Sequence, residues 1–367
     1  MTRAVFWDRE HGATPVVCGV NAINGLAFNS HQSWAFRRAD MRAIHESPFR
    51  LPDGELASMA HIRAMPREEY GAARLLSILG HTLGTWPAWL AGRVSVDRLA
   101  VALALPERHG EHAVHERFRR ERAQLEIGLR RLLVEARIEP RLELHAYGHA
   151  GPAYSMRWAG ELIAAGQADV VLVLGVDSYY DPEVVDALAE GGRVFDGRRA
   201  EGFIPGEGGA LVVLAGKTFA RTNQWSIQAE LVAASIGHEN ASLHGGPNLG
   251  AGLTETVCAL SDELVARQET VDWWLGDVST ESVRVREFQL AFPRFSARVA
   301  HRRSTMELLP SHFGDLGAAT IPTGVAIAIE GFSRGDPSAR NCLLWAASDG
   351  PSRGAVLLRN PRRGAHA

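Results

Sequence analysis

The sequence has few cysteines and no long apolar run. Its three cysteines, Cys18, Cys258 and Cys342, are far apart, odd in number and without a CxxC pair. This pattern excludes a disulfide framework and a cysteine zinc site, and it is typical of a reducing compartment. No apolar run reaches the length of a transmembrane helix, and the N-terminal residues lack the apolar segment of a secretory signal. We therefore expect a cytoplasmic protein with no membrane partner.

A surplus of positive charge is also missing. The chain of 367 residues has 39 basic and 42 acidic residues, which gives a net charge of −3. The arginine-rich run at 117–131 is interleaved with glutamates, as in the solvated face of an amphipathic helix. We therefore expect no nucleic-acid partner. The glycine-rich stretch 245–252 lacks the lysine of a phosphate-binding loop, and we expect no serine-hydrolase elbow.

Short apolar runs alternate with helical patterns along the chain. Asp169–Val176 is apolar after its first residue and too short to cross a membrane, so it predicts a strand buried on both faces. Residues 152–165 carry apolar side chains at helical spacing, and Gly166 ends that helix. Gly202–Gly216 predicts a glycine-rich turn that leads into a second buried strand. Residues 46–66 contain several prolines and are expected to be irregular. This alternation predicts a layered α/β fold.

Residues 166–216 resemble the core of the β-ketoacyl synthases, a family of the thiolase superfamily. In that family a GxxDxxLxGGxD strand is followed by an RxGFxPGEGAxxLxL turn and strand. The corresponding residues are Gly166, Asp169, Leu172, Leu174, Gly175, Asp177 and Gly202–Ala210. The resemblance extends over roughly residues 14–360, and the turn at 202–214 is its most specific part.

This resemblance implies a fold, an assembly and a reaction. The fold is α/β, a thiolase-like five-layer αβαβα arrangement built from two similar halves. We place the halves at residues 1–217 and 218–367, because the strand and helix patterns begin again near residues 216–223. The family forms homodimers and catalyses decarboxylative Claisen condensation of acyl thioesters. It therefore implies an acyl-CoA or acyl-carrier-protein partner and no cofactor.

The residues that the family uses for condensation are replaced in this sequence. The reaction needs a cysteine thiolate at a helix N-terminus and imidazole or amide donors for the malonyl thioester. Counting back 17 residues from Gly166 places His149 at the nucleophile position, and the two histidine positions fall on Asp277 and Asp315. The position of the family's lysine falls on Pro310. An imidazole cannot hold a stable acyl chain as a thiolate can, and two carboxylates would repel a malonyl carboxylate.

Two interpretations of His149 remain open. It is either an acid/base or ligand group in an inherited pocket, or a buried histidine whose hydrogen bonds replace those of a lost active site. In the first case, pairing with Asp277 and Asp315 would fix its tautomer and raise its pKa. A metal ion held by the three residues is the lesser alternative, so we expect no metal site. The family's glycine-rich C-terminal gate, at Ser348–Pro351 here, is altered as well.

Other polar and aromatic residues have simpler expected roles. Glu207 is expected to be structural, tied into its turn as in the family. Core packing is expected for the tryptophan pair 273–274, although the pair adjoins Asp277 and could line the pocket. We expect the histidine triplet His109, His112 and His115 to lie in a solvated segment and not to form a metal site.

A narrower resemblance concerns one branch of the family. Its segments are Gly148–Gly151, Gly175–Pro182, Gly202–Gly208 and Trp345–Arg353. Proteins of this branch occur in type VI secretion gene neighbourhoods, near tip-associated proteins and effectors. The resemblance implies a non-condensing binding or adaptor protein that handles a secretion effector. The alternative is an acyl-thioester hydrolase or acyltransferase with His149 as general base. A chain-length-factor-like partner of a true synthase is a third option.

Overall fold

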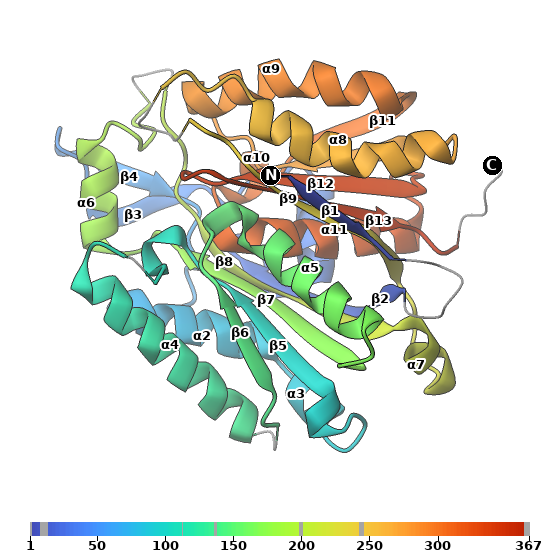
Figure 1. The fold of residues 1–367 in the computed structure, drawn as a ribbon. Coiled ribbons are helices and arrows are strands. Elements are labelled where there is room, and N and C mark those ends of the chain that lie inside the picture. The colour runs from blue at the N-terminus through green and yellow to red at the C-terminus, as the bar shows by residue number, and fades with distance from the viewer. Residues whose placement is uncertain are drawn as a thin grey trace.

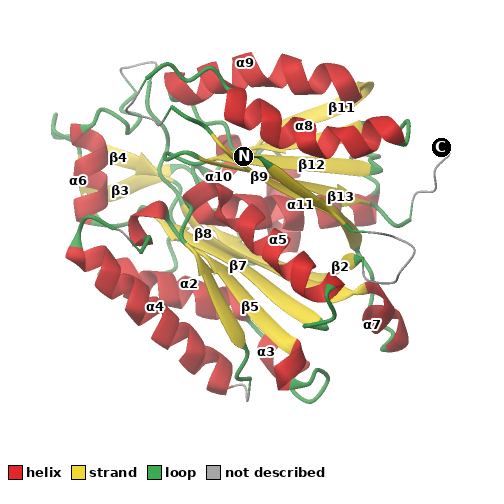
Figure 2. Cartoon of the chain, in the orientation of Figure 1, coloured by secondary structure: helices red, strands yellow, loops and turns green. Residues whose placement is uncertain are grey.

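The computed structural model describes residues 2–7, 14–111, 113–135, 138–197, 201–241 and 246–362. Within these ranges eleven strands form one mixed sheet, and two more strands form a separate hairpin (Figures 1 and 2). The fold is therefore the mixed α/β fold that the sequence predicts. No helix in these ranges is both long and apolar enough to cross a membrane.

The first half of the sheet mixes antiparallel and parallel pairing. Its strands are β2 (Pro15–Asn24), β5 (Leu99–Ala104), β6 (Arg141–His145), β7 (Val170–Ser178) and β8 (Glu207–Gly216). Their spatial order is β2-β8-β7-β5-β6. β8 pairs antiparallel with both β2 and β7, whereas β5 pairs parallel with β7 and β6.

The second half repeats this topology. Its strands are β9 (Ala229–His238), β10 (Val271–Gly276), β11 (Ala300–Leu308), β12 (Asn341–Ala347) and β13 (Ser352–Arg359). Their spatial order is β9-β13-β12-β10-β11, with two antiparallel pairs followed by two parallel pairs. Numbered along the chain, the strands of both halves therefore stand in the order 1-5-4-2-3. The two halves of the expected fold are thus similar in topology.

The halves meet along one short strand pairing. β2 and β9 pair antiparallel through Val16 with Glu230 and Val17 with Ala229. β1 (Arg3–Phe6) pairs antiparallel with β9 as well. The predicted boundary between residues 217 and 218 falls just after β8, at the start of α7 (Lys217–Thr222). It stays a prediction, because the sheet is continuous across the two halves.

The helices form three layers around the two halves of the sheet (Figure 1). The larger helices are α2 (Gly71–Leu83), α4 (Glu116–Glu135), α5 (Gly151–Ala164), α8 (Ala251–Ala266), α9 (Ser282–Val299) and α11 (Thr320–Arg334). α2 and α4 lie on the outer side of the first half, and α8 and α9 on the outer side of the second half. α5 and α11 lie between the halves, and each packs against strands of both. The result is the five-layer αβαβα order.

The central strand β7 shows why its apolar run could be predicted. All nine of its residues are buried. Val171 and Val173 point into the core shared with α5 and α11, whereas Leu172 and Leu174 point into the core shared with α2 and α4. A strand covered by helices on both faces needs apolar side chains at every position, which confirms the prediction.

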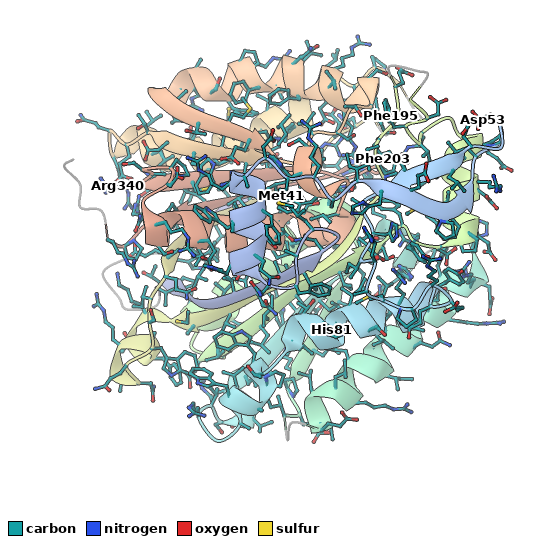
Figure 3. The ribbon with its side chains drawn as sticks, turned by 180° about the vertical axis from the view of Figure 1, so that it is seen from behind. Met41, Asp53, His81, Phe195, Phe203 and Arg340 are labelled. Atoms are coloured by element: carbon teal, nitrogen blue, oxygen red, sulfur yellow. The ribbon has the colours of Figure 1, made fainter. Side chains whose placement is uncertain are left out.

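The prediction of an irregular segment at residues 46–66 is wrong. β3 (His45–Arg50) and β4 (Leu56–Met59) form an antiparallel hairpin there, with Asp53 at its turn (Figure 3). The pairing register shifts between Glu46 and Arg50, where Pro48 lies. A proline at such an irregularity is tolerated, because no ladder hydrogen bond from its nitrogen is needed.

Short helices complete the fold. They are α1 (Ser30–Arg38), α3 (Trp86–Leu90), α6 (Pro182–Glu190) and α10 (Pro310–Phe313). Single 3₁₀ turns lie at Val96–Arg98, Glu107–His109, Gly148–Ala150 and Gly317–Ala319. The turns at 107–109, 148–150 and 317–319 contribute to the site described next.

Candidate functional site

The three candidate residues come from three different strand–helix connections. His149 lies in the 3₁₀ turn between β6 and α5, Asp277 directly follows β10, and Asp315 precedes α11. Gly148 has φ +54°, so a glycine suits the sharp turn that presents His149. Its N–H donates to the carbonyl of Leu105, 3.1 Å away, which ties the turn to the end of β5.

His149 and Asp315 form a buried ion pair. The His149 Nε2 lies 2.7 Å from the Asp315 Oδ1. His149 is 4% exposed and Asp315 is 2% exposed. The Gly317 N–H donates to the same Oδ1 at 2.8 Å, which aims the carboxylate at the imidazole.

The pair favours the charged forms of both groups. Burial lowers the pKa of His149, but the charge and hydrogen bond of Asp315 outweigh it and raise that pKa to about 9. Burial raises the pKa of Asp315, but the His149 cation outweighs it and holds that pKa below its usual value. At neutral pH the imidazole is therefore a cation with a proton on each nitrogen.

Asp277 does not join this pair by a hydrogen bond. Its Oδ2 accepts from the Ala347 N–H at 2.7 Å and lies 3.9 Å from the Arg284 Nη1. Burial raises its pKa. Of the two carboxylates predicted to pair with His149, only Asp315 forms a hydrogen bond with it. Asp277 raises the pKa of His149 through its charge, without direct contact.

Arg284 is the central residue that the sequence interpretation missed. It is buried in the first turn of α9, and its guanidinium donates to the Ala347 carbonyl and to the Asp349 Oδ1, the latter at 2.5 Å. Burial lowers the pKa of Arg284, but Asp349 and Asp277 outweigh it, so the group stays charged. Nothing in the local pattern of α9 distinguishes this arginine from those on a solvated face.

The altered C-terminal gate closes directly on the His149 turn. The Ser348 hydroxyl accepts from the Ala150 N–H at 2.9 Å and donates to the Tyr147 carbonyl at 2.6 Å. The Glu107 carboxylate accepts from the Gly350 N–H at 3.0 Å. The N–H that follows His149 is thus already satisfied by a side chain of this chain.

Asp349 links the gate to a second, half-buried arginine. The Arg193 Nη1 lies 2.8 Å from the Asp349 Oδ2, and the Arg193 Nε lies 2.7 Å from the Glu281 Oε1. Burial raises the pKa of Asp349, but Arg284 and Arg193 outweigh it and hold it well below its usual range. The three cations of this cluster, His149 included, thus lie among the carboxylates of Asp277, Asp315, Asp349 and Glu281.

A cavity of about 510 Å³ reaches His149 from outside. Asp177, Tyr179 and Asp349 line it with His149, whereas Asp277 and Asp315 lie behind the wall. The arginines of its lining are already paired, in the ion pairs Arg108–Asp177, Arg117–Asp181 and Arg193–Asp349. The cavity therefore gives access to His149, but its arginines already have carboxylate partners within the chain.

The turn at 202–214 holds the loop of Asp315 in place. The Asp315 N–H donates to the Ile204 carbonyl at 2.8 Å. Glu207 is fully buried, and the Arg74 Nε and Nη2 donate to its two carboxylate oxygens, each at 2.6 Å. It also accepts from the Ser178 hydroxyl at 2.6 Å. The predicted structural role of Glu207 is confirmed.

Of the remaining candidates, Trp273, Trp274 and His109 lie outside the cavity at His149, whereas His115 belongs to its lining. Both tryptophans of the 273–274 pair are buried in the core, as expected. His109 is buried 2.9 Å from Glu121, so the expectation of a solvated segment is wrong there, whereas His115 is exposed and His112 lies outside the described residues. Among the described residues no three potential ligands are grouped to hold a metal.

A possible serine elbow is likewise excluded by its context. Gly350–Gly354 has the GxSxG spacing. Its serine, Ser352, is the first residue of β13, which continues antiparallel to β12. A nucleophile elbow requires a strand-to-helix turn, so the expectation that no elbow forms holds for a structural reason.

Comparisons with known proteins agree with this fold. Residues 150–220 match the family described as beta-ketoacyl synthase, N-terminal domain. The match begins directly after His149 and covers less than half of the chain, so it does not itself align His149 with a nucleophile. No curated protein matches the sequence.

Solved structures match over almost the whole chain. The oxazolomycin ketosynthase domain OzmH KS7 of Streptomyces albus JA3453 has a TM-score of 0.74 at 16% identity, covering 96% of this chain and 75% of that chain. A beta-ketoacyl synthase from Burkholderia phymatum STM815 has a TM-score of 0.71 at 18% identity, covering 95% and 100%. The ketosynthase of AntDE:AntF, a complex with its type II acyl-carrier protein, has a TM-score of 0.72 at 13% identity, covering 94% and 98%. The chain is thus similar to β-ketoacyl synthases at residues 150–220 and has the thiolase-like fold of ketosynthases throughout.

Proposed function

We propose that this protein is a ketosynthase-fold binding or adaptor protein that does not catalyse condensation. The observation that carries the proposal is the buried ion pair between His149 and Asp315, whose Nε2 and Oδ1 lie 2.7 Å apart. The sequence resemblance predicts these two positions for the family's nucleophile and second histidine. A pair of this kind neutralises two groups that a condensing enzyme keeps available for substrate.

The chemistry of condensation fails at each of the three positions. An imidazolium has no free lone pair, so His149 cannot attack a thioester while its pKa stands at about 9. The Asp315 carboxylate only accepts hydrogen bonds and cannot polarise a carbonyl. Asp277 accepts from the Ala347 N–H and lies behind the cavity wall.

The backbone near His149 supports the same proposal. Oxyanion stabilisation needs N–H groups that point at the reacting oxygen. The Ala150 N–H instead donates to Ser348, and the Gly350 N–H donates to Glu107. Internal acceptors therefore occupy donors at both the helix N-terminus and the altered gate.

The proposed partner is a protein, in the cytoplasm. The resemblance of four short segments to proteins from type VI secretion neighbourhoods supports a secretion effector as that partner. An acyl thioester, on CoA or an acyl carrier protein, is the other candidate ligand, because the cavity of about 510 Å³ leads to His149.

One observation favours a second candidate function. The cavity reaches His149, so a thioester hydrolase or acyltransferase with His149 as general base has an access route. Such a base must lose a proton to act, and the raised pKa opposes this at neutral pH. This candidate therefore predicts activity that rises from pH 7 to pH 9.

Turnover of acyl thioesters tests the proposal against this alternative. The full chain is incubated with malonyl-CoA, acyl-CoA and acyl-carrier-protein donors at pH 7 and pH 9, and adducts, thiol release and decarboxylation are measured. His149→Ala is compared with His145→Ala, a matched change of a histidine outside the cavity. We expect no adduct and no turnover in any sample. Turnover that His149→Ala abolishes and His145→Ala retains would overturn the proposal.

A further inference from the structure

A second cavity lies beside the β3–β4 hairpin, away from His149. Its volume is about 590 Å³, and its lining combines His45 of β3, the loop after β4, Arg74 of α2 and Tyr180. It shares no lining residue with the cavity at His149. The hairpin and α2, which carries His81 near its end, lie on the face of the molecule shown in Figure 3.

Positive charge dominates this lining. Arg63 and Arg67 are exposed, and neither has an ion pair with another residue in the described part of the chain. Arg74 is neutralised by Glu207. Glu46 is the acidic side chain of the lining, so with neutral histidines the cavity keeps a net charge of one positive unit.

His61 supplies a buried ring nitrogen that lacks a hydrogen-bond partner. The residue is 8% exposed, and among the described residues its Nδ1 has no hydrogen-bond partner. Its ring lies 5.2 Å from the ring of Tyr180, which in turn lies 3.9 Å from the Arg74 guanidinium. A buried polar atom without a partner costs free energy, and a ligand that pairs with it would recover that cost.

The pKa values of the two histidines are lowered partly by the same positive charges. Burial lowers the pKa of His61; the charges of Arg74 and His45 lower it further, and Glu207 opposes them. Burial lowers the pKa of His45 as well, and Arg63 adds to the effect. An anion in the cavity would oppose these contributions and raise the pKa of both histidines.

The start of α2 adds to this field. α2 begins at Gly71, its first turn carries no acidic side chain, and no side-chain hydrogen bond caps it. Arg74, in that first turn, lines the cavity. The N-terminal end of a helix carries partial positive charge and favours anions nearby.

We propose that this cavity binds a phosphate-bearing small molecule. Arg63 and Arg67 contact the phosphate oxygens, and His61 donates its unpartnered Nδ1–H. Guanidinium groups suit this ligand because their donors match phosphate oxygens in pairs. The cavity is larger than a phosphate ion and falls within the range of small-molecule sites. The inference goes beyond the proposed function and uses none of the residues around His149.

Calorimetric titration of the full chain tests this site, with inorganic phosphate, pyrophosphate and ADP as probes. We expect saturable binding to one site, accompanied by proton uptake, because the bound anion raises the pKa of His61 and His45. The groups that face these histidines are Arg63, Arg74, Glu207, Glu46 and Tyr180. Repeating the titration in buffers of different ionisation enthalpy measures the uptake.

Two pairs of arginine variants distinguish binding in this cavity from non-specific attraction of anions to surface arginines. Arg63→Gln/Arg67→Gln is expected to weaken binding at least about tenfold, because two charge-assisted contacts are lost. The matched control Arg131→Gln/Arg286→Gln removes two exposed arginines elsewhere and should leave binding unchanged. Pyrophosphate binding as tight as ADP binding identifies the phosphate groups as the recognised part, and tighter ADP binding identifies an organic phosphate. Absence of saturation with all three probes, or equal loss in the control, would overturn the proposal; neither result bears on His149.

Discussion

His149 is best understood at the scale of single residues as one half of a charge pair. The neighbouring Asp315 carboxylate is oriented by the Gly317 N–H and cannot turn away to solvent. Its field outweighs the burial of the imidazole, so the protonated form of His149 is the stable one. His149 therefore links the first half of the molecule to Asp315 in the second half.

Stability should depend on pH through this residue. The folded pKa of about 9 lies above the ordinary value of 6.5, so the contribution is complete below pH 6.5 and is lost as pH rises through 9. The largest effect on the free energy of unfolding is about 3 kcal/mol. Urea denaturation of the wild type and of His149→Gln at pH 6.5 and at pH 9.5 measures it. The wild-type advantage should shrink at the higher pH; an advantage that stays constant would contradict the ion pair.

The turn before α11 carries a second residue-level prediction. Gly317 has φ +49°, and a Cβ there would lie 1.9 Å from the Asp177 Oδ2. Gly317→Ala should therefore lower the free energy of unfolding by at least about 2 kcal/mol. The matched control is Gly335→Ala, where φ is +66° but no atom lies within 4 Å of the added carbon. Gly335→Ala should lower the free energy of unfolding by only about 1 kcal/mol, through backbone strain. Equal losses would show that the contact with Asp177 does not matter.

At the scale of elements, the turn at 202–214 depends on a buried ion pair with a helix. Arg74 of α2 forms a bidentate ion pair with Glu207 at the start of β8, and both side chains are buried. Each oxygen of the carboxylate also accepts another donor, from Ser178 or from the Ile62 N–H. The pair fixes the position of α2 relative to the loop that carries Asp315.

Breaking this pair should be costly. Arg74→Met leaves the Glu207 carboxylate buried without its cation, so the free energy of unfolding should fall by about 3–5 kcal/mol. Arg120→Met removes one partner of an exposed pair with Glu116 and should change it by less than about 1 kcal/mol. Denaturant midpoints of the two variants, compared with the wild type, give both values. A small loss in Arg74→Met would mean that water reaches Glu207.

At the scale of the whole molecule, the unpaired outer edge of β6 is a candidate surface for dimer formation. Within the described residues β6 pairs only with β5, so its other edge has no strand partner. Tyr147 beside it is 41% exposed and stacks on Tyr154 at 4.3 Å. A free strand edge offers unpaired N–H and C=O groups that can pair with another chain. We propose that a second copy covers this edge in a two-fold homodimer.

Light scattering of the purified chain tests the dimer. We expect a mass twice that of one chain, and Tyr147→Glu should shift it towards the monomer because a charge would be buried in the interface. Leu249→Glu, a change of another exposed apolar residue, serves as the control and should leave the dimer intact. A monomer in the wild type would refute the proposal.

The sequence by itself predicted the elements whose signal is local. β7 and α5 could be placed because a doubly covered strand and an amphipathic helix each leave an apolar pattern in adjacent residues. The β3–β4 hairpin could not, because Pro48 lies at its irregular position and argued against a strand. His149 was predicted by counting back from Gly166 along a family motif, and Asp315 by the resemblance of its segment to another part of the family. Such a resemblance records the order of residues in the chain but not their contact.

Only the tertiary structure decided how the charges pair. Arg284 is 65 residues from Asp349 in the sequence, yet its Nη2 lies 2.5 Å from that carboxylate. Asp277 was expected to bind His149 directly, but it accepts from the backbone of Ala347. Burial patterns repeat over a few residues and can be read from the chain, whereas the energy of a charge depends on its distance to every other charge and on the exclusion of water. Those distances exist only once the two halves have packed around α5 and α11.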